Sequence, residues 1–327
     1  MCLPLPLAII KKKKMARAYT GVVCIKQETG RNGCLSFLGP YCARMTGGVF
    51  VSKTLPVGVQ VYSVRGDAEK DFAGTMKKIK KMGYDGVELA GLYGLTPEQV
   101  RDAIREAGLV PLSAHVPYVE LAADMEKVVS DYETIGCQYI AVPYLTPEYR
   151  PGTEEFPNVV ETIDRIGECC NRHGIVLMYH NHDFEFQTRI DGMYALDYLY
   201  KTVPADRLQT EIDTCWVNVA GENPADYVRK YTGRAPVVHL KDFWKKEGKS
   251  GKMYELIGIK DDGNGEAEEK TFGFMPVGYG QQDIPSILQA SLDAGAKWVV
   301  VEQDASDERP PLEAIAMSRE YLKKQGW

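Results

Sequence analysis

The sequence predicts an α/β protein whose eight strands and eight helices form one (β/α)8 barrel. From residue 57 onward, short β-rich runs alternate with longer amphipathic runs, and such alternation is typical of a parallel sheet. The alternation completes eight units in roughly 270 residues, which is the size of this kind of barrel. A doubly wound sheet is the alternative, but no G-x-G-x-x-G motif opens a helix here.

The expected strands are short runs rich in Val, Ile, Leu and aromatic residues. They cover residues 57–62, 86–91, 110–115, 138–144, 175–182, 207–213, 235–242 and 298–304.

The expected helices have apolar residues three or four positions apart and recognisable ends. In the second helix, Thr96 is an N-cap residue, Pro97 occupies the first turn and Gly108 ends the helix. The helices cover residues 68–83, 96–108, 123–136, 158–174, 193–203, 223–233, 283–295 and 311–326.

Composition predicts a cytoplasmic protein with no membrane and no nucleic-acid partner. Hydrophobic residues make up 44% and charged residues 26% of the chain, with a net charge of −6. A non-specific nucleic-acid binder is more often basic, and no run reaches the ~18 apolar residues of a membrane span. The eight cysteines include no C-x-x-C pair, which favours reduced thiols.

The N-terminal segment lacks the regular pattern of the rest of the chain. We expect residues 53–327 to form the single barrel domain. Residues 1–52 begin with an apolar run followed by four lysines, the reverse of the order in a secretory signal. We expect a disordered or mis-annotated N-terminal extension, with Met45 as the alternative start; a membrane-surface anchor is a further alternative. Within the barrel, residues 243–277 are rich in Gly and charge and predict a long loop, functional or disordered, that closes over the active site.

Four consecutive expected strands end in potential metal ligands. These are His180, Asp213, His239 and Glu302. In a (β/α)8 barrel the active site lies at the carboxyl ends of the strands, and imidazole and carboxylate groups bind divalent cations such as Mn²⁺, Zn²⁺ or Co²⁺. The alternative is a buried polar network that fills the barrel.

Other polar residues near the strand ends are candidates for catalysis or substrate binding. His182, Glu185 and Lys241 are candidates for proton transfer, although each has a structural alternative, such as an ion pair between Lys241 and Asp242. The candidates for substrate binding are Tyr62, Arg65, Glu88, His115 and Trp216.

The strand-end motifs resemble a known family. They include VQVYSVRGDAEKD, GYDGVELAGLYG, SAHV, YHNHDFEF, EIDTCW, VHLKD, VGYGQQDI and VVVEQD. Together, over residues 57 to 324, they resemble the sugar phosphate isomerase/epimerase family, whose members have the xylose isomerase-like TIM barrel and are related to endonuclease IV.

The resemblance implies one divalent metal held by Glu, Asp, His and Glu at the ends of strands five to eight. Asp213, His239 and Glu302 match this pattern, whereas His180 stands where the family has Glu. In the epimerases that Glu is also one of two acid/base groups, so its replacement puts the two-carboxylate mechanism in doubt. Trp216 and Tyr279 depart from the family pattern as well.

The leading hypothesis is a metal-dependent isomerase or epimerase of a sugar, sugar phosphate or keto-sugar, acting by α-proton abstraction and a metal-stabilised enediolate. A lyase or dehydratase on a 3-keto sugar, 3-keto-glycoside or inosose is the alternative. A non-catalytic sugar-binding barrel and an endonuclease IV-like repair enzyme are less favoured. The expected partner is a small carbohydrate, with a homo-oligomer left open.

Overall fold

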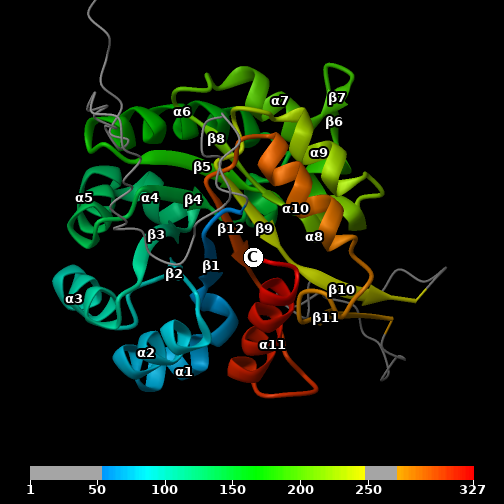
Figure 1. The fold of residues 1–327 in the computed structure, drawn as a ribbon. Coiled ribbons are helices and arrows are strands. Elements are labelled where there is room, and N and C mark those ends of the chain that lie inside the picture. The colour runs from blue at the N-terminus through cyan, green and yellow to red at the C-terminus, as the bar shows by residue number, and fades with distance from the viewer. Residues whose placement is uncertain (1–53, 247–270) are drawn as a thin grey trace, which may run out of the picture. The chain divides into compact units, whose positions relative to one another are not determined.

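The computed structural model describes residues 54–246 and 271–327, and in them eight parallel strands close into a barrel (Figure 1). Around the barrel the strands follow their order in the chain. They are β1 (Val57–Gln60), β2 (Gly86–Ala90), β3 (Val110–His115), β4 (Tyr139–Val142), β5 (Val176–His180), β8 (Gln209–Asp213), β9 (Val237–Leu240) and β12 (Trp298–Val301). The predicted fold class is confirmed. The expectations for residues 1–52 lie outside the described residues.

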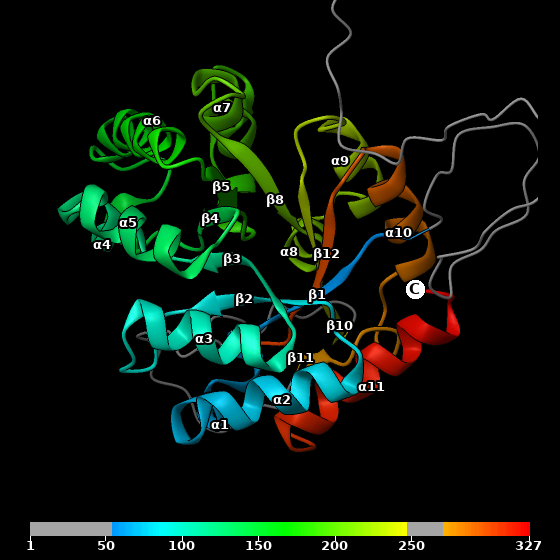
Figure 2. The same cartoon turned by 60° about the vertical axis from the view of Figure 1, so that its left-hand side comes forward.

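Helices surround the barrel, and the last of them packs beside the first ones. Figure 2 shows α2 between α3 and α11, in agreement with the contacts between these helices. The helices are α1 (Arg65–Lys70), α2 (Phe72–Met82), α3 (Pro97–Ala107), α4 (Tyr118–Ala123), α5 (Met125–Ile135), α6 (Phe156–Arg172), α7 (Ala195–Thr202), α8 (Thr214–Val219), α9 (Pro224–Lys230), α10 (Ile284–Asp293) and α11 (Pro311–Lys324).

Helix ends follow the capping residues in the sequence. The Thr96 hydroxyl accepts from the Gln99 backbone N–H, and the Gln99 side chain accepts from the Thr96 N–H, which forms a capping box at the start of α3. Gly108 ends α3 with a φ of 77°, a conformation that glycine adopts without steric cost.

The barrel interior changes from apolar to polar along the strands. Met178, Val237 and Val300 belong to one buried apolar cluster. Because side chains on a strand alternate between its two faces, the residues two positions further along also point inward. Those residues are His180, His239 and Glu302, so the alternation places polar groups at the carboxyl end of the barrel.

Two elements differ from the expectation. The predicted helix 68–83 is divided at Asp71, whose extended backbone (φ −155°) ends α1 and whose side chain caps α2. The described ends of the predicted loop 243–277 form an antiparallel ribbon of β10 (Asp242–Lys245) and β11 (Phe272–Met275), and residues 247–270 lie outside the described part. The ribbon was missed because its two strands are too short to show a period.

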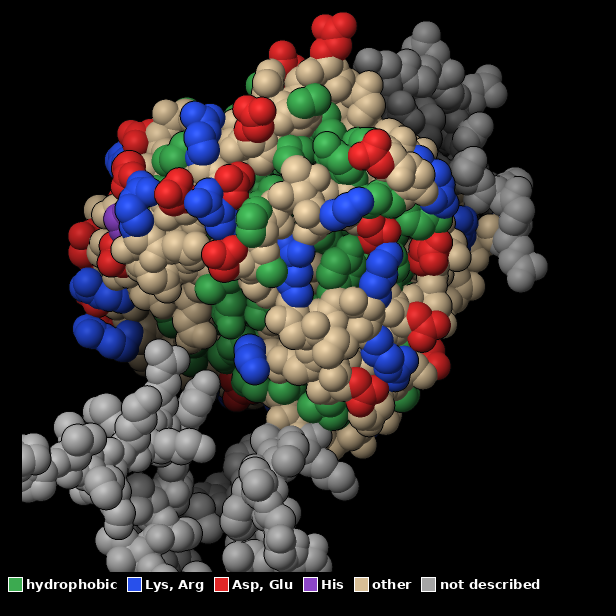
Figure 3. Space-filling model, turned by 90° about the horizontal axis from the view of Figure 1, so that it is seen from above, with side chains coloured by type: hydrophobic (Ala, Val, Ile, Leu, Met, Phe, Trp, Pro, Cys, Tyr) green, Lys and Arg blue, Asp and Glu red, His purple; other side chains and the backbone are tan. Residues whose placement is uncertain are grey.

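A second small ribbon, β6 (Arg189–Ile190) with β7 (Met193–Tyr194), and the one-turn helices α4 and α8 were not predicted either. Among the described residues, no helix combines the length and the apolar character that crossing a membrane requires. On the face drawn in Figure 3, acidic and basic side chains lie interspersed. This mixture differs from the basic stripe that marks a nucleic-acid footprint.

Candidate active site

Four neighbouring strands each supply two inward-facing polar residues, two positions apart, at or just beyond their carboxyl ends. All eight side chains are buried, so their charges must be balanced within the barrel. The pairs are His180 and His182, Glu211 and Asp213, His239 and Lys241, and Glu302 and Asp304.

The four predicted metal ligands come together. His180, Asp213, His239 and Glu302 each place one ligand atom so that all four lie within 4.8 Å of one another. His180 Nε2 is 3.5 Å from Asp213 Oδ2, and His239 Nδ1 is 3.0 Å from Glu302 Oε2. A buried cluster of imidazoles and carboxylates can hold a divalent cation.

Asp213 is fixed by the start of helix α8. Its Oδ1 accepts the backbone N–H groups of Cys215 and Trp216, at 2.8 and 3.1 Å. Its Oδ2 accepts no backbone N–H group and faces the cluster, with Lys241 Nζ at 3.2 Å and His180 Nε2 at 3.5 Å. The N-cap position therefore leaves one carboxylate oxygen available as a ligand.

Lys241 supplies a buried positive charge beside the cluster. Its Nζ lies 2.8 Å from Asp304 Oδ2, 3.0 Å from Glu302 Oε2 and 3.2 Å from Asp213 Oδ2. Burial alone would lower the pKa of Lys241, but the three carboxylates raise it well above its usual range. The lysine is thus an ammonium. It is paired with these three carboxylates. The alternative, an ion pair between Lys241 and Asp242, is therefore wrong.

The pKa values of neighbouring groups diverge. Burial lowers the pKa of His182 well below its usual range, and Lys241 reinforces the effect. Burial raises the pKa of Asp304 to about 7, against the opposing effect of Lys241. Burial would also raise the pKa of Glu302, but Lys241 and His239 hold it below its ordinary value. At neutral pH this end of the barrel holds a neutral imidazole and an ammonium side by side.

Asp242 binds backbone groups of a neighbouring loop and does not pair with Lys241. Its carboxylate accepts the backbone N–H groups of Phe243, Gly278, Gly280 and Gln282. A Cβ atom at Gly280 would lie 2.2 Å from Asp242 Oδ1. The VGYGQQD motif therefore folds around Asp242. Because Asp242 directly follows Lys241, these hydrogen bonds also fix the backbone at the lysine.

Below the cluster lies a second buried group. Glu211 Oε2 is 2.6 Å from His115 Nε2 and 3.1 Å from His180 Nδ1. Glu88 Oε1 is 2.8 Å from His239 Nε2 and accepts a hydrogen bond of 2.8 Å from Gln60. Burial alone would lower the pKa of His115, but Glu88 and Glu211 raise it to about 10.

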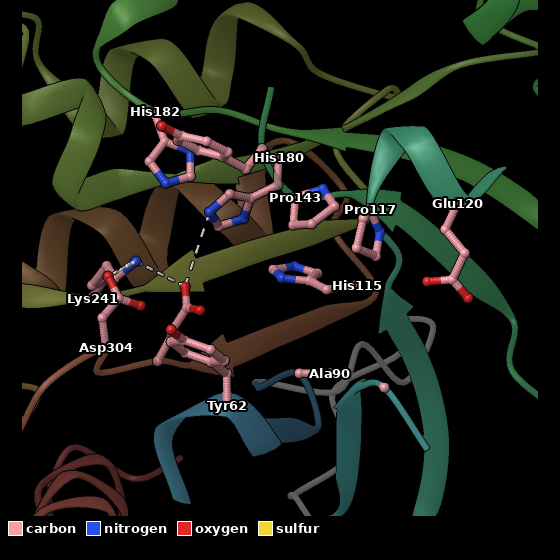
Figure 4. Close-up of a pocket in the computed structure, with 13 residues that line it drawn as sticks. Tyr62, Ala90, His115, Pro117, Glu120, Pro143, His180, His182, Lys241 and Asp304 are labelled. Carbon is pink, nitrogen blue, oxygen red and sulfur yellow. Dashed lines mark hydrogen bonds and ion pairs between the residues drawn. The ribbon is translucent and has the colours of Figure 1, made fainter. Parts of the chain in front are cut away.

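A cavity of about 410 Å³ opens above both groups, within the size range of small-molecule sites. Figure 4 shows His115, His180, His182, Lys241 and Asp304 around this space, with Tyr62 on the near side and Glu120 across it. The lining consists of Tyr62, Ala90, Gly91, His115, Pro117, Glu120, Pro143, Tyr144, His180, His182, Lys241, Glu302 and Asp304.

Six predicted site residues do not line the cavity: the metal-ligand candidates Asp213 and His239, which lie in the cluster beneath it, and four of the predicted catalytic and substrate-binding residues. Arg65 donates to the carbonyls of Tyr62 and Asp304, at 2.8 and 2.9 Å. Trp216 is buried, and its ring stacks on that of His182 at 5.1 Å. Both residues therefore support the lining from behind.

The other two lie deeper. Glu185 accepts from the Tyr179 hydroxyl at 2.7 Å and from the His182 backbone N–H at 2.9 Å. Glu88 lies beneath the cluster, as described above. Glu185 was chosen as a proton-transfer candidate from its place in a polar run, but its carboxylate points toward the backbone behind His182.

Sequence reasoning assigned no role to Asp304, Glu120 or Tyr144, which line the cavity, or to Glu211 beneath it. Asp304 and Glu211 could have been found, because each lies two residues from a predicted ligand in the same extended run and alternation turns both inward. Glu120 and Tyr144 follow their strands at irregular distances, and their sequence carries no comparable signal.

Fold and site together define a (β/α)8 barrel with a polar, potentially metal-binding centre at the carboxyl ends of its strands. A family model described as xylose isomerase-like TIM barrel matches residues 76–325, and the chain belongs to this family. The family predicted from the sequence is thereby confirmed.

The relatives are enzymes. An inosose dehydratase from Clostridium botulinum is 22% identical over 280 residues, which cover 79% of this chain and 90% of the relative. An inosose dehydratase from Bacillus licheniformis is 26% identical over 234 residues, covering 69% and 72%. The prediction that the chain is an enzyme is confirmed, because the curated relatives over most of its length are named as dehydratases.

A solved structure shares the fold at lower sequence identity. The sugar phosphate isomerase/epimerase from Parabacteroides distasonis has a TM-score of 0.64 and 20% identity, covering 83% of this chain and 94% of that one. At this level of identity the similarity establishes the barrel, and the reaction has to be argued from the site.

Proposed function

We propose that the protein is a divalent-metal-dependent dehydratase of a cyclic keto-polyol or keto-sugar. The observation that carries the proposal is the pairing of a neutral His182 with a cationic Lys241 in the cavity that adjoins the four-residue cluster. A neutral imidazole can act as the base that removes a carbon-bound proton, and an ammonium can act as the acid that protonates a departing hydroxyl group. The names of the curated relatives support the same reaction.

The metal would be held by His180, Asp213, His239 and Glu302. Their ligand atoms are close enough to share one ion. The backbone donors of α8 contact only Oδ1 of Asp213, so its buried Oδ2 faces the other ligand candidates. A bound divalent ion supplies a Lewis acid that polarises the substrate's ketone and so acidifies the neighbouring C–H bond.

His182 takes the proton. A metal-bound imidazole has no lone pair for this task, which excludes His180. His182 is outside the cluster and lines the cavity. Its depressed pKa keeps it neutral at physiological pH. The C–H bond breaks, the proton moves to the imidazole, and the electron pair passes into the carbonyl system.

Lys241 donates the second proton. Its ammonium faces the cavity beside Asp304, where it can protonate the hydroxyl on the β-carbon. That C–O bond breaks, water leaves, and a carbon–carbon double bond forms next to the ketone. His182 has then gained a proton and Lys241 has lost one, and exchange with water restores both.

The charges around the cavity favour a neutral substrate over a phosphate ester. Among the described lining residues, the acids are Glu120, Glu302 and Asp304. Lys241 is already paired with carboxylates, and His115 lies against Glu211. Both cationic side chains of the described lining are therefore already paired with carboxylates and are not available to a phosphate group, whereas hydroxyl groups can donate to the carboxylates.

An epimerase or isomerase is the second candidate. Asp304, with a pKa near 7, is a further group that can return a proton to carbon. The reaction would then begin with the same deprotonation but end without loss of water. The two candidates therefore differ in product and share their first step.

The test uses an inosose as the probe, the full chain and Mn²⁺, with products followed by mass spectrometry and by exchange of deuterium from D₂O. We expect loss of one water molecule and a new ultraviolet absorbance from the conjugated ketone. His182→Gln should lower kcat by about 10²–10⁴-fold, whereas His173→Gln, at a histidine paired with Glu126 and Glu133 on the surface, should not.

A product that retains its water and differs only in stereochemistry or carbonyl position would favour the second candidate. Full activity of His182→Gln would contradict the proposed base.

A further inference from the structure

One carboxylate beneath the proposed metal ligands contacts three imidazoles. Glu211 Oε2 lies 2.6 Å from His115 Nε2, 3.1 Å from His180 Nδ1 and 3.5 Å from His239 Nε2. Strand register explains the contact with His180, because His180 on β5 is the direct partner of Glu211 on β8. Both side chains are buried, so water does not compete for this contact.

The contact determines which nitrogen of His180 carries a proton. A neutral imidazole has one N–H group and one lone pair. An ionised carboxylate can only accept hydrogen bonds. The contact of 3.1 Å between Glu211 Oε2 and His180 Nδ1 therefore assigns the proton of His180 to Nδ1. The lone pair is then on Nε2, which faces Asp213 Oδ2 at 3.5 Å and Glu302 Oε2 at 4.0 Å.

The same geometry decides between two overlapping groups of possible ligands. His115, His180, Glu211 and His239 also bring their ligand atoms within 4.8 Å of one another. This lower group shares His180 and His239 with the upper cluster, and a neutral imidazole cannot offer a lone pair to both. The contact of 2.6 Å between Glu211 and His115 has the length of a strong charge-assisted hydrogen bond, so Glu211 already serves as an acceptor.

We propose that Glu211 is a positioning residue that fixes the tautomer and ring orientation of His180, so that Nε2 is presented to the metal. The inference rests on the metal site of the proposed function. Glu88 stands in the same relation to His239, since its Oε1 lies 2.8 Å from Nε2 while Nδ1 faces Glu302. Carboxylates that accept from the second nitrogen of a ligating histidine raise both its basicity and its order.

The first test is the affinity for Mn²⁺ alone, measured by titration calorimetry on the full chain. Glu211→Gln should weaken binding by about 10–100-fold, because the amide is a poorer acceptor and can turn its NH₂ toward His180. Glu185→Gln is the matched control. It makes the same change at another buried glutamate that contacts none of the four cluster residues, and we expect its Mn²⁺ affinity to equal that of the wild type.

The outcomes separate the inference from the function on which it rests. Equal affinity of wild type and Glu211→Gln overturns the role of Glu211 and leaves the metal site intact. A wild type that binds no Mn²⁺, Zn²⁺ or Co²⁺ contradicts the metal site, and with it both proposals.

A second measurement needs no stable Glu211 variant. In the Zn²⁺-loaded wild type labelled with ¹⁵N-histidine, the chain has only five histidines to resolve. The signals of His180, identified by their loss in His180→Gln, should show a protonated Nδ1 and a metal-bound Nε2. The reverse assignment overturns the inference.

Discussion

At the scale of single residues, Lys241 is the buried cation that balances three carboxylates of the site. Its buried ammonium contacts three carboxylates that come from β8 and from the segment that follows β12. Removing one partner from a buried ionic group leaves the others uncompensated. Lys241→Met should therefore lower the free energy of unfolding by about 3–5 kcal/mol in the presence of EDTA, as measured by urea denaturation.

Added Mn²⁺ should recover much of that loss, because a cation on the same carboxylates replaces the missing charge. Lys230→Met is the control, since Lys230 pairs with Asp197 at the surface with 46% of its side chain exposed. We expect this control to change stability by about 1 kcal/mol or less. An unfolding free energy of Lys241→Met equal to that of the wild type would contradict the charge balance described above.

At the scale of elements, Glu185 braces the turn between β5 and the short 3-10 helix Phe184–Phe186. It joins the Tyr179 hydroxyl on β5 to the backbone of His182. Burial raises the pKa of Glu185 from its ordinary value of 4.5 to about 8. The folded protein therefore binds a proton at Glu185 that the unfolded chain releases between these two pH values.

Stability should fall as pH rises through this window, because the folded state binds more protons than the unfolded state there. In Glu185→Gln, which cannot ionise, this contribution should be absent. The measurement is urea denaturation of both proteins at intervals from about pH 5 to 9, with the difference between them plotted against pH. A difference that does not change with pH would show that Glu185 is ionised in the folded protein.

At the scale of the whole molecule, the strand order and the four-residue cluster followed from the sequence, because alternation of elements and strand-end position are local patterns. His180, Asp213, His239 and Glu302 come together only because the barrel closes, and the barrel was predictable. The sequence could not show the pairing of His180 with Glu211, because the register between β5 and β8 is set by packing between segments that lie about 30 residues apart in the chain. The sequence also could not show whether Trp216 and Glu185 line the cavity or pack behind the residues that line it, since that depends on side-chain direction.

The most direct test of the account is the divalent metal content of the purified full chain beside an Asp213→Ala, His239→Ala double variant. The variant also separates the barrel site from a second, partly exposed group, Glu126, Cys169 and His173, which brings ligand atoms equally close. We expect about one ion per chain in the wild type after incubation with Mn²⁺, Zn²⁺ or Co²⁺, and its loss in a folded double variant. A wild type that retains no ion, or a double variant that retains as much as the wild type, would contradict the assignment of the metal site to these strand ends.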